Sequence, residues 1–232
     1  MSILRSLAFY VAFYGGSVVW VLGAVIASHV APKRMRWFCD MWSWWHSVCV
    51  EALLGIEIRI TGNRPTTQAF YAIKHESFFE AISMPWLFDY PAAFAKAELS
   101  DIPGWGNVSD SYGNIPVARD QGATALRQML KAIRPAVAAG RPIVIFPEGT
   151  RVPHGTRPPL QSGFAALYKL TGLPVVPVAV NSGPLYHKRW KTRGTITVHF
   201  GDPIAPGLPR AEIEALVHDG INLLNSPPQP TN

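Results

Sequence analysis

Residues 7–30 form a run of 24 residues without a formal charge, and no other feature limits the possible folds of this sequence more strongly. As a helix with a rise of 1.5 Å per residue, the run is about 36 Å long, which is enough to cross roughly 30 Å of hydrocarbon. Tyr10, Tyr14 and Trp20 add aromatic side chains of the kind that favour a membrane interface. We therefore expect this run to anchor the chain in a membrane.

Two other interpretations of this run are a buried core helix and a secretory signal peptide. A core helix is disfavoured because the run is apolar on all sides. A signal peptide has support in Arg5, but the run is longer than a typical signal-peptide core, and Lys33, Arg34 and Arg36 follow it at once. These three basic residues outnumber Arg5, which predicts that the bulk of the chain lies on the cytoplasmic side.

A second helix is predicted over residues 35–54. Its polar residues recur at helical spacing and make one narrow stripe: Arg36, Asp40, Ser43, Ser47 and Glu51. Nearly everything else on it is apolar, so we expect this helix to lie in the bilayer interface or to pack beside the first helix. Residues 1–55 are thus predicted to form a two-helix membrane anchor.

Composition narrows the class of protein. The chain has 232 residues, room for one catalytic domain and a short appendage. Hydrophobic residues make up 48% and charged residues 16%, which excludes an intrinsically disordered chain, while a mean hydropathy of +0.12 excludes a transporter with many spans. A net charge of +6 favours an anionic partner: nucleic acid, a membrane surface or a phosphorylated substrate. Two cysteines are too few for a disulfide framework.

After Gly55, short apolar segments alternate with helical ones, which indicates the α/β class: a mixed, partly parallel sheet covered by helices, forming one domain over residues 56–225. The predicted strands are residues 56–60, 69–73, 92–95, 115–118, 143–146, 175–180 and 196–200. The predicted helices are residues 78–88, 124–139, 162–170 and 210–224. Pro135 is expected to kink the second of these helices or end it early. The tail, residues 226–232, is predicted to be disordered.

His75 and Glu80 follow the second predicted strand. Inside one helix, five positions would set them about 140° apart around the axis. If His75 lies instead in the turn before the helix, the Glu80 carboxylate can reach back to one ring nitrogen and leave the other as a general base. The alternative is a solvated loop histidine beside a surface glutamate.

Other uses of His75 find no support in the sequence. A zinc-protease motif would need a second ligand where Phe79 stands, and there is no Gly-x-Ser-x-Gly elbow, zinc-site cluster, Walker loop or dinucleotide fingerprint. We expect no metal site. The pattern indicates a base without an enzyme nucleophile, one that activates the hydroxyl of its substrate.

Three cations follow the ends of predicted strands. Residues 146–151 read Phe-Pro-Glu-Gly-Thr-Arg, in which proline and glycine shape a turn and Thr150 and Arg151 present donors to an anion. Arg119 and Lys96 follow two other strands in the same way. Together they predict a pocket for a phosphate monoester, and the alternative is three unrelated surface charges.

These residues carry a resemblance to the glycerolipid acyltransferase family, and most closely to its bacterial members that acylate 1-acylglycerol 3-phosphate. The family has four blocks in order, and this chain has a counterpart of each: residues 75–80, 113–119, 146–151 and 176–178. The similarity covers residues 56 to about 205. It implies transfer of a fatty acyl group from acyl-CoA or acyl carrier protein to the sn-2 hydroxyl of 1-acylglycerol 3-phosphate, giving phosphatidic acid.

The resemblance also implies roles for individual residues. His75 is expected to be the base, and Glu80 is expected to orient it. A further set is placed around the glycerol phosphate: Arg119, Glu148, Gly149, Thr150 and Arg151, with Lys96 as a weaker addition. No bound cofactor and no nucleic acid are implied. The partners are the acyl thioester and a lysophosphatidic acid in the bilayer, and the location is the bacterial inner membrane, with the catalytic domain on the cytoplasmic side.

The chain departs from the family pattern at four positions. Lys74 stands where Asn is usual, Glu80 where Asp is usual, and Pro116 and Ala118 alter the second block. Three alternatives therefore stay open: acylation of another lyso-lipid such as lyso-ornithine lipid, acylation of glycerol 3-phosphate, and a non-catalytic membrane-binding homologue. A basic cluster around Trp190 is a candidate contact for lipid headgroups, coenzyme A or an acidic carrier protein: Lys188, Arg189, Lys191 and Arg193.

Overall fold

The computed structural model describes residues 1–102, 104–117 and 122–225, with the backbone alone for residues 122–126. The chain divides into two compact units. The first unit consists of Met1–Gly55 and Ile82–Val144, and the second of Ile56–Ala81 and Ile145–Asn232. The predicted division of the chain into residues 1–55, 56–225 and 226–232 stays a prediction, and its last segment lies outside the described residues.

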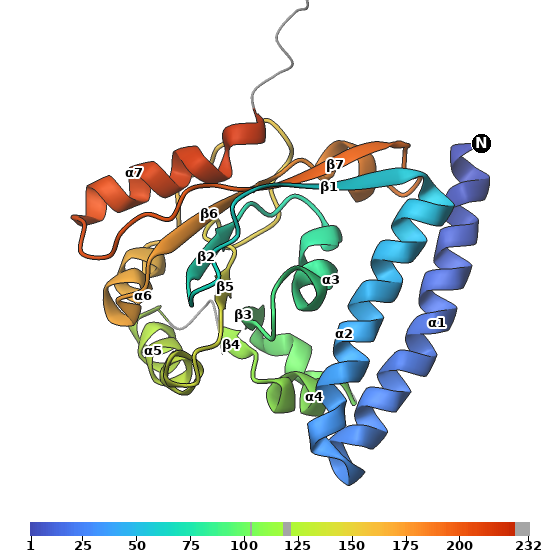
Figure 1. The fold of residues 1–232 in the computed structure, drawn as a ribbon, viewed down its shortest axis with the longest axis horizontal. Helices are drawn as coiled ribbons and strands as arrows, with labels where there is room; N and C mark the ends of the chain where they lie inside the picture. The colour runs from blue at the N-terminus through green and yellow to red at the C-terminus, as the bar shows by residue number, and fades with distance from the viewer. Residues whose placement is uncertain (103, 118–121, 226–232) are drawn as a thin grey trace, which may run out of the picture. The chain divides into compact units, whose positions relative to one another are not determined.

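Two long helices begin the first unit. Helix α1 (Ser2–Val30) and helix α2 (Pro32–Cys49) lie side by side, and a single π-helical turn, η1 (Val50–Leu54), continues α2 up to Gly55 (Figure 1). Both helices were expected, and α1 begins earlier than the uncharged run. Trp42 Nε1 donates to Ser17 Oγ at 2.9 Å, which is one of the polar contacts that hold α2 against α1.

A third helix, α4 (Trp105–Tyr112), packs on this pair. The shared core consists of buried hydrophobic side chains: Ala24, Ala27, Met35, Val108 and Tyr112. The small alanines of α1 let the neighbouring helices approach closely, so this part of α1 is covered by protein.

Most of α1 is nevertheless uncovered and apolar. Its exposed side chains include Leu4, Leu7, Val11, Val18 and Leu22. Helix α1 is long and apolar enough to cross a membrane, and only 17% of its most apolar 18-residue window is buried. A soluble core helix would bury this surface, so the exposure favours lipid as its neighbour.

The first unit also contains three parallel strands in the order β5-β3-β4. They are β3 (Ala92–Lys96), β4 (Ile115–Val117) and β5 (Ile143–Ile145), and the 3-10 helix η2 (Ala97–Asp101) follows β3. Helix α5 (Gly122–Ala138) contacts β4. Gly113 ends α4 with φ +82°, and the Arg141 guanidinium occupies the space where a Cβ would stand.

The second unit has four strands in the order β1-β7-β6-β2. They are β1 (Ile56–Gly62), β2 (Phe70–Ile73), β6 (Val175–Val180) and β7 (Gly194–Phe200). β1 pairs with β7 in parallel and β2 with β6 in parallel, whereas β6 and β7 are antiparallel. Every residue of β2 and β6 is buried, as is typical of strands covered on both faces.

Helix α7 (Arg210–Ile221) packs on β6 and β2, and α6 (Gly163–Thr171) contacts α7. Two short turns complete the unit, the π-helical η4 (Gly183–His187) and the 3-10 helix η5 (Leu223–Asn225). Helix α3 (Phe78–Leu87) begins in this unit and continues into the first.

The structure confirms the α/β class with mixed strand directions, and each of the seven predicted strands is present. The four predicted helices are present too. Pro135 does not end α5 early, since the helix continues to Ala138, and a kink at Pro135 stays a prediction.

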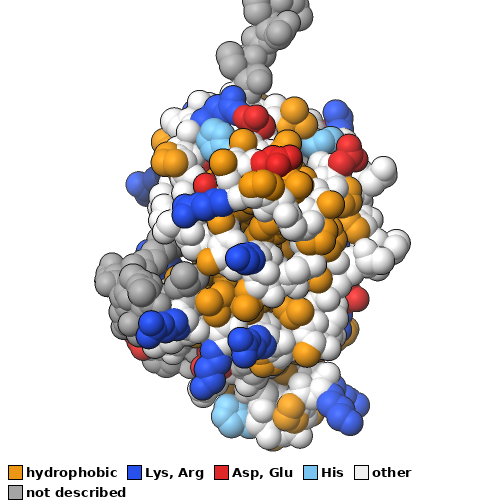
Figure 2. All heavy atoms as spheres, turned by 90° about the vertical axis from the view of Figure 1, so that its left-hand side faces the viewer, with side chains coloured by type: hydrophobic (Ala, Val, Ile, Leu, Met, Phe, Trp, Pro, Cys, Tyr) orange, Lys and Arg blue, Asp and Glu red, His pale blue; other side chains and the backbone are white. Residues whose placement is uncertain are grey.

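Basic side chains are spread over the surface face drawn in Figure 2, between hydrophobic ones and with fewer acidic ones, as the net charge of +6 leads one to expect.

In the basic cluster around Trp190, one of the four cations points into the protein. Lys191 is buried and its ammonium donates to Tyr186 O at 2.7 Å, and burial lowers the pKa of Lys191 to about 8. Lys188, Arg189 and Arg193 are exposed, so an anionic surface could meet only these three.

Candidate active site

The parallel pairing of β2 and β6 creates the position of the site. Ile73 lies opposite Val178, so both strands run to the same edge of the sheet. The chain leaves β2 into Lys74 and His75 and leaves β6 into Asn181 and Ser182. Ligands of such sheets gather at the carboxyl ends of the strands, and these four polar residues lie there.

His75 and Glu80 form a hydrogen-bonded pair. His75 lies in the turn before α3 and Glu80 in the first turn of that helix, as the spacing predicted. His75 Nδ1 is 3.0 Å from Glu80 Oε2, and the side chains are 13% and 1% exposed. These exposures exclude a solvated loop histidine beside a surface glutamate.

Glu80 is held by donors on every side. Its Oε2 accepts from the backbone N–H of Glu76 at 3.2 Å and of Ser77 at 2.8 Å, as well as from the imidazole. Its Oε1 accepts from the Ser182 hydroxyl. Since the carboxylate can only accept, His75 must carry its proton on Nδ1, and its Nε2 keeps a free lone pair for a proton.

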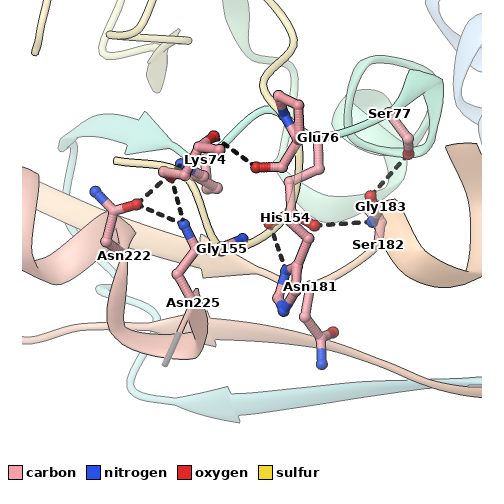
Figure 3. A network of polar contacts seen from close by, with 12 residues as sticks. Lys74, Glu76, Ser77, His154, Gly155, Asn181, Ser182, Gly183, Asn222 and Asn225 are labelled. Atoms are coloured by element: carbon pink, nitrogen blue, oxygen red, sulfur yellow. Dashed lines mark hydrogen bonds and ion pairs between the residues drawn. The ribbon is translucent and has the colours of Figure 1, made fainter. Parts of the chain in front are cut away.

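Ser77 and Ser182 extend this arrangement. Their hydroxyl oxygens are 2.7 Å apart, and both residues are fully buried (Figure 3). Because the proton of Ser182 goes to Glu80, Ser77 donates to Ser182. Neither hydroxyl is therefore available as a nucleophile, which leaves His75 without a nucleophile of its own in this cluster.

The turn at residues 146–151 lies against His75. The Phe146 ring stacks on the imidazole at 3.8 Å between centroids, and Val152 N donates to His75 O at 2.8 Å. Gly149 has φ +75°, and a Cβ there would be 2.7 Å from Gln161 Cγ, so the turn requires glycine.

Arg151 leaves the turn toward the start of α3. Its guanidinium lies 4.1 Å from the centroid of the Phe78 ring, and both side chains are exposed. Thr150 beside it is also exposed. The structure thus brings an imidazole and an exposed arginine to one edge of one unit, which suits a substrate that carries a hydroxyl and an anionic group.

Glu148 points the other way. Its carboxylate is 0% exposed and forms an ion pair with Lys74, Oε1 to Nζ 2.6 Å, so its partner is not Arg151. The residue on the other side of His75, Glu76, is paired too, because its Oε1 lies 2.9 Å from His154 Nδ1 (Figure 3). Burial raises the pKa of Glu76. The hydrogen bonds that its carboxylate accepts from Gly183 N–H and forms with His154 oppose this increase.

Comparison with known proteins identifies the family. The family described as Acyltransferase matches residues 55–181, more than half of the chain. A 1-acyl-sn-glycerol-3-phosphate acyltransferase of Pseudomonas aeruginosa is 30% identical over 204 residues, which cover 85% of this chain and 79% of that protein. The chain belongs to the acyltransferase family.

Two further relatives extend the comparison. A 1-acyl-sn-glycerol-3-phosphate acyltransferase of Limnanthes alba is 31% identical over 161 residues, 66% of this chain and 56% of that protein. The crystal structure of the 1-acyl-sn-glycerophosphate acyltransferase PlsC of Thermotoga maritima superposes with a TM-score of 0.76 and 20% identity, covering 97% of this chain and 96% of that one. This likeness extends the fold over nearly the whole acyltransferase.

The described structure does not test two of the predicted phosphate-binding residues of this acyltransferase. Arg119 lies outside the described residues. Lys96 ends β3 in the first unit, where its side chain is exposed. Their roles, like those of the other predicted site residues of the acyltransferase, stay predictions.

Sequence reasoning missed three residues of the acyltransferase site. Ser182 could have been found, because it lies just beyond a predicted strand on the sheet edge where ligands gather. His154 and Lys74 could not, since their partners Glu76 and Glu148 are 78 and 74 positions away in the chain.

Proposed function

We propose that this acyltransferase transfers a fatty acyl group from a thioester to the sn-2 hydroxyl of 1-acylglycerol 3-phosphate and so forms phosphatidic acid. The observation that carries the proposal is the His75–Glu80 pair, in which Nδ1 is engaged and Nε2 is left as the base. The names of the relatives support the acceptor, since each of those described above acts on 1-acylglycerol 3-phosphate.

The reaction needs no covalent enzyme intermediate. His75 Nε2 takes the proton of the acceptor hydroxyl while that oxygen attacks the thioester carbonyl. Glu80 stabilises the imidazolium that forms, because its Oε2 already accepts from Nδ1 at 3.0 Å. The thiolate of coenzyme A or acyl carrier protein leaves as the new ester bond forms, and the imidazolium returns the proton to it.

The test is an assay of membranes that contain the protein. They are incubated with labelled acyl-coenzyme A and 1-acylglycerol 3-phosphate, and in parallel with acyl carrier protein thioesters. Labelled phosphatidic acid is the expected product. Its absence with both donors, together with transfer to lyso-ornithine lipid or glycerol 3-phosphate, would replace the proposed acceptor.

Arg151 is proposed to bind the phosphate of the acceptor. Changing Arg151 to alanine should raise KM for 1-acylglycerol 3-phosphate by at least about tenfold, because a charge-assisted hydrogen bond to phosphate is lost. KM for the acyl thioester should change little. Steady-state kinetics with each substrate varied in turn measures both values.

The Arg151→Lys variant provides the control for this experiment. Lysine keeps the positive charge but lacks the planar guanidinium group, so the KM of this variant for the acceptor should lie between those of the unchanged protein and Arg151→Ala. An equal rise in KM for donor and acceptor would remove Arg151 from the phosphate site.

We also propose that α1 holds the enzyme in the inner membrane of a bacterial cell with its site on the cytoplasmic side. The exposed apolar surface of α1 supports membrane insertion, and the exposed Lys33 and Arg34 after it support the orientation. Arg36 contributes less than expected, because it forms ion pairs with Asp40 and Asp89.

Replacing both Val18 and Leu22 with arginine should move the protein from the membrane fraction to the soluble or aggregated fraction. These side chains are 58% and 55% exposed, and each arginine near the bilayer centre costs about 2.5–3.5 kcal/mol. Recovery after an alkaline carbonate wash measures the effect, with Val18→Leu plus Leu22→Val as the matched control. Full retention of the double arginine variant in the washed membranes would mean that another surface holds the protein.

A further inference from the structure

Lys74 is the residue before His75, and its side chain is 0% exposed. Its ammonium has three N–H donors, and the structure provides an acceptor for each of them. Nζ is 2.6 Å from Glu148 Oε1, 2.8 Å from Asn222 Oδ1 and 2.9 Å from Thr156 O. The buried charge is therefore fully compensated, which the burial of a lysine requires.

The three acceptors come from two segments that are distant from Lys74 in the sequence, and Figure 3 shows one of them, Asn222, beside Lys74. Glu148 and Thr156 lie on either side of Arg151 in the same loop. Asn222 lies at the end of α7 and is held by Asn225 Nδ2 at 2.8 Å. Asn225 also accepts from Gly155 N at 3.0 Å and donates to Thr156 O at 2.8 Å, so the C-terminal residues close the far side of the loop.

The next residue, His75, bonds to the same loop, because its carbonyl accepts from Val152 N at 2.8 Å. Lys74 therefore fixes the loop before and after Arg151, and the backbone of His75 fixes it between. We propose that Lys74 is a positioning residue, which sets the distance between the base His75 and the anion-binding Arg151. The kinetic part of this proposal rests on the proposed function.

The charge of Lys74 matters as well as its reach. Glu148 is buried, and within the described part of the chain its Oε2 has no hydrogen-bond partner. The ammonium of Lys74 thus offsets the cost of burying the Glu148 carboxylate. Without it the loop would hold an uncompensated buried charge, which is relieved when Glu148 moves toward water or takes up a proton.

The first test uses the full-length protein in membranes and needs no substrate. Trypsin cleaves after exposed lysine and arginine, but Arg157 is followed by Pro158, which blocks cleavage there. Cutting after Arg151 therefore reports release of this loop. Lys74→Met keeps the volume and removes the charge, and it should speed this cut at least about tenfold, since cleavage follows the population of the open form.

Lys191→Met is the matched control, because Lys191 is also a buried lysine of this unit and donates to Tyr186 O outside the loop. It should leave the rate of the cut after Arg151 unchanged. If Lys74→Met does not fold, Asn222→Leu carries the test, since it removes one of the three acceptors, and about a threefold faster cut is expected. An unchanged rate in the folded variant, or an equal rise in Lys191→Met, would overturn the proposal.

The second test separates positioning from a loss of folded protein. Lys74→Met should raise KM for 1-acylglycerol 3-phosphate and lower kcat/KM by about 10²-fold, the effect of a displacement of about 1 Å. A smaller amount of folded enzyme would lower the apparent kcat alone. In a Glu148→Gln background the same change should cost much less, because the two residues act as a pair.

A KM for the acceptor that does not change in Lys74→Met would contradict the positioning role. Failure of the proposed function is a different result: the unchanged protein would then transfer no acyl group to 1-acylglycerol 3-phosphate, while the cut after Arg151 would still report whether Lys74 holds the loop.

Discussion

Replacing His75 with alanine should lower kcat/KM for acyl transfer by at least about 10³-fold, because a general base contributes about 10²- to 10⁴-fold. The hydroxyls of Ser77 and Ser182 are buried, and they are engaged with each other and, through Ser182, with Glu80. Labelled phosphatidic acid formed per unit of membrane-bound protein measures the loss.

His187→Ala is the control for this prediction, since His187 is exposed on η4. It should keep full activity, and both variants should stay in the membrane fraction. Activity of His75→Ala within about tenfold of the unchanged protein would show that His75 is not the base, and the non-catalytic interpretation would then be tested on the unchanged protein.

Changing Glu80 to glutamine should lower kcat by about 10²- to 10⁴-fold and leave KM for both substrates nearly unchanged. The amide is neutral, so it cannot stabilise the imidazolium. It also cannot accept from every donor around Glu80 at once: two backbone N–H groups, the imidazole and the Ser182 hydroxyl.

Glu80→Asp tests whether charge or reach matters more. The shorter side chain keeps the charge but moves it by one methylene from Nδ1, so its kcat should lie between those of Glu80→Gln and the unchanged protein. Glu212→Gln on the exposed start of α7 controls for removal of a carboxylate from the same unit. A rise in KM with a normal kcat in Glu80→Gln would mean that Glu80 binds substrate and does not orient the base.

The strands were predictable because each buried strand of a largely parallel sheet is a short apolar run bounded by loops. Helix α4 was not predicted, since its sequence contains Asn107, Ser109, Asp110 and Ser111, which favour turns over helix interiors. It is stabilised by tertiary contacts, in which Val108 and Tyr112 pack against Ala24 and Ala27 of α1. Helix propensity depends on the local sequence alone and therefore does not predict such tertiary contacts.

In the site, too, local contacts were predictable from the sequence and long-range contacts were not. His75 and Glu80 are five residues apart, so helix geometry alone predicted their contact. Lys74 was visible in the sequence only as a departure from the family pattern. Its role could not be predicted, because its partners Glu148 and Asn222 come from segments that only the fold brings together. Glu148 is predicted to lie around the glycerol phosphate, and the sequence did not indicate that its buried carboxylate pairs with Lys74.

The length of chain between Lys74 and Asn222 also has a consequence for biosynthesis. The two residues are 148 positions apart, and at about 5–20 residues per second the ribosome reaches Asn222 about 7 to 30 s after Lys74. During this interval α1 has left the ribosome, while the ammonium of Lys74 still lacks one of its acceptors. The loop around Arg151 can therefore gain its full set of contacts through Lys74 only after Asn222 has been synthesised.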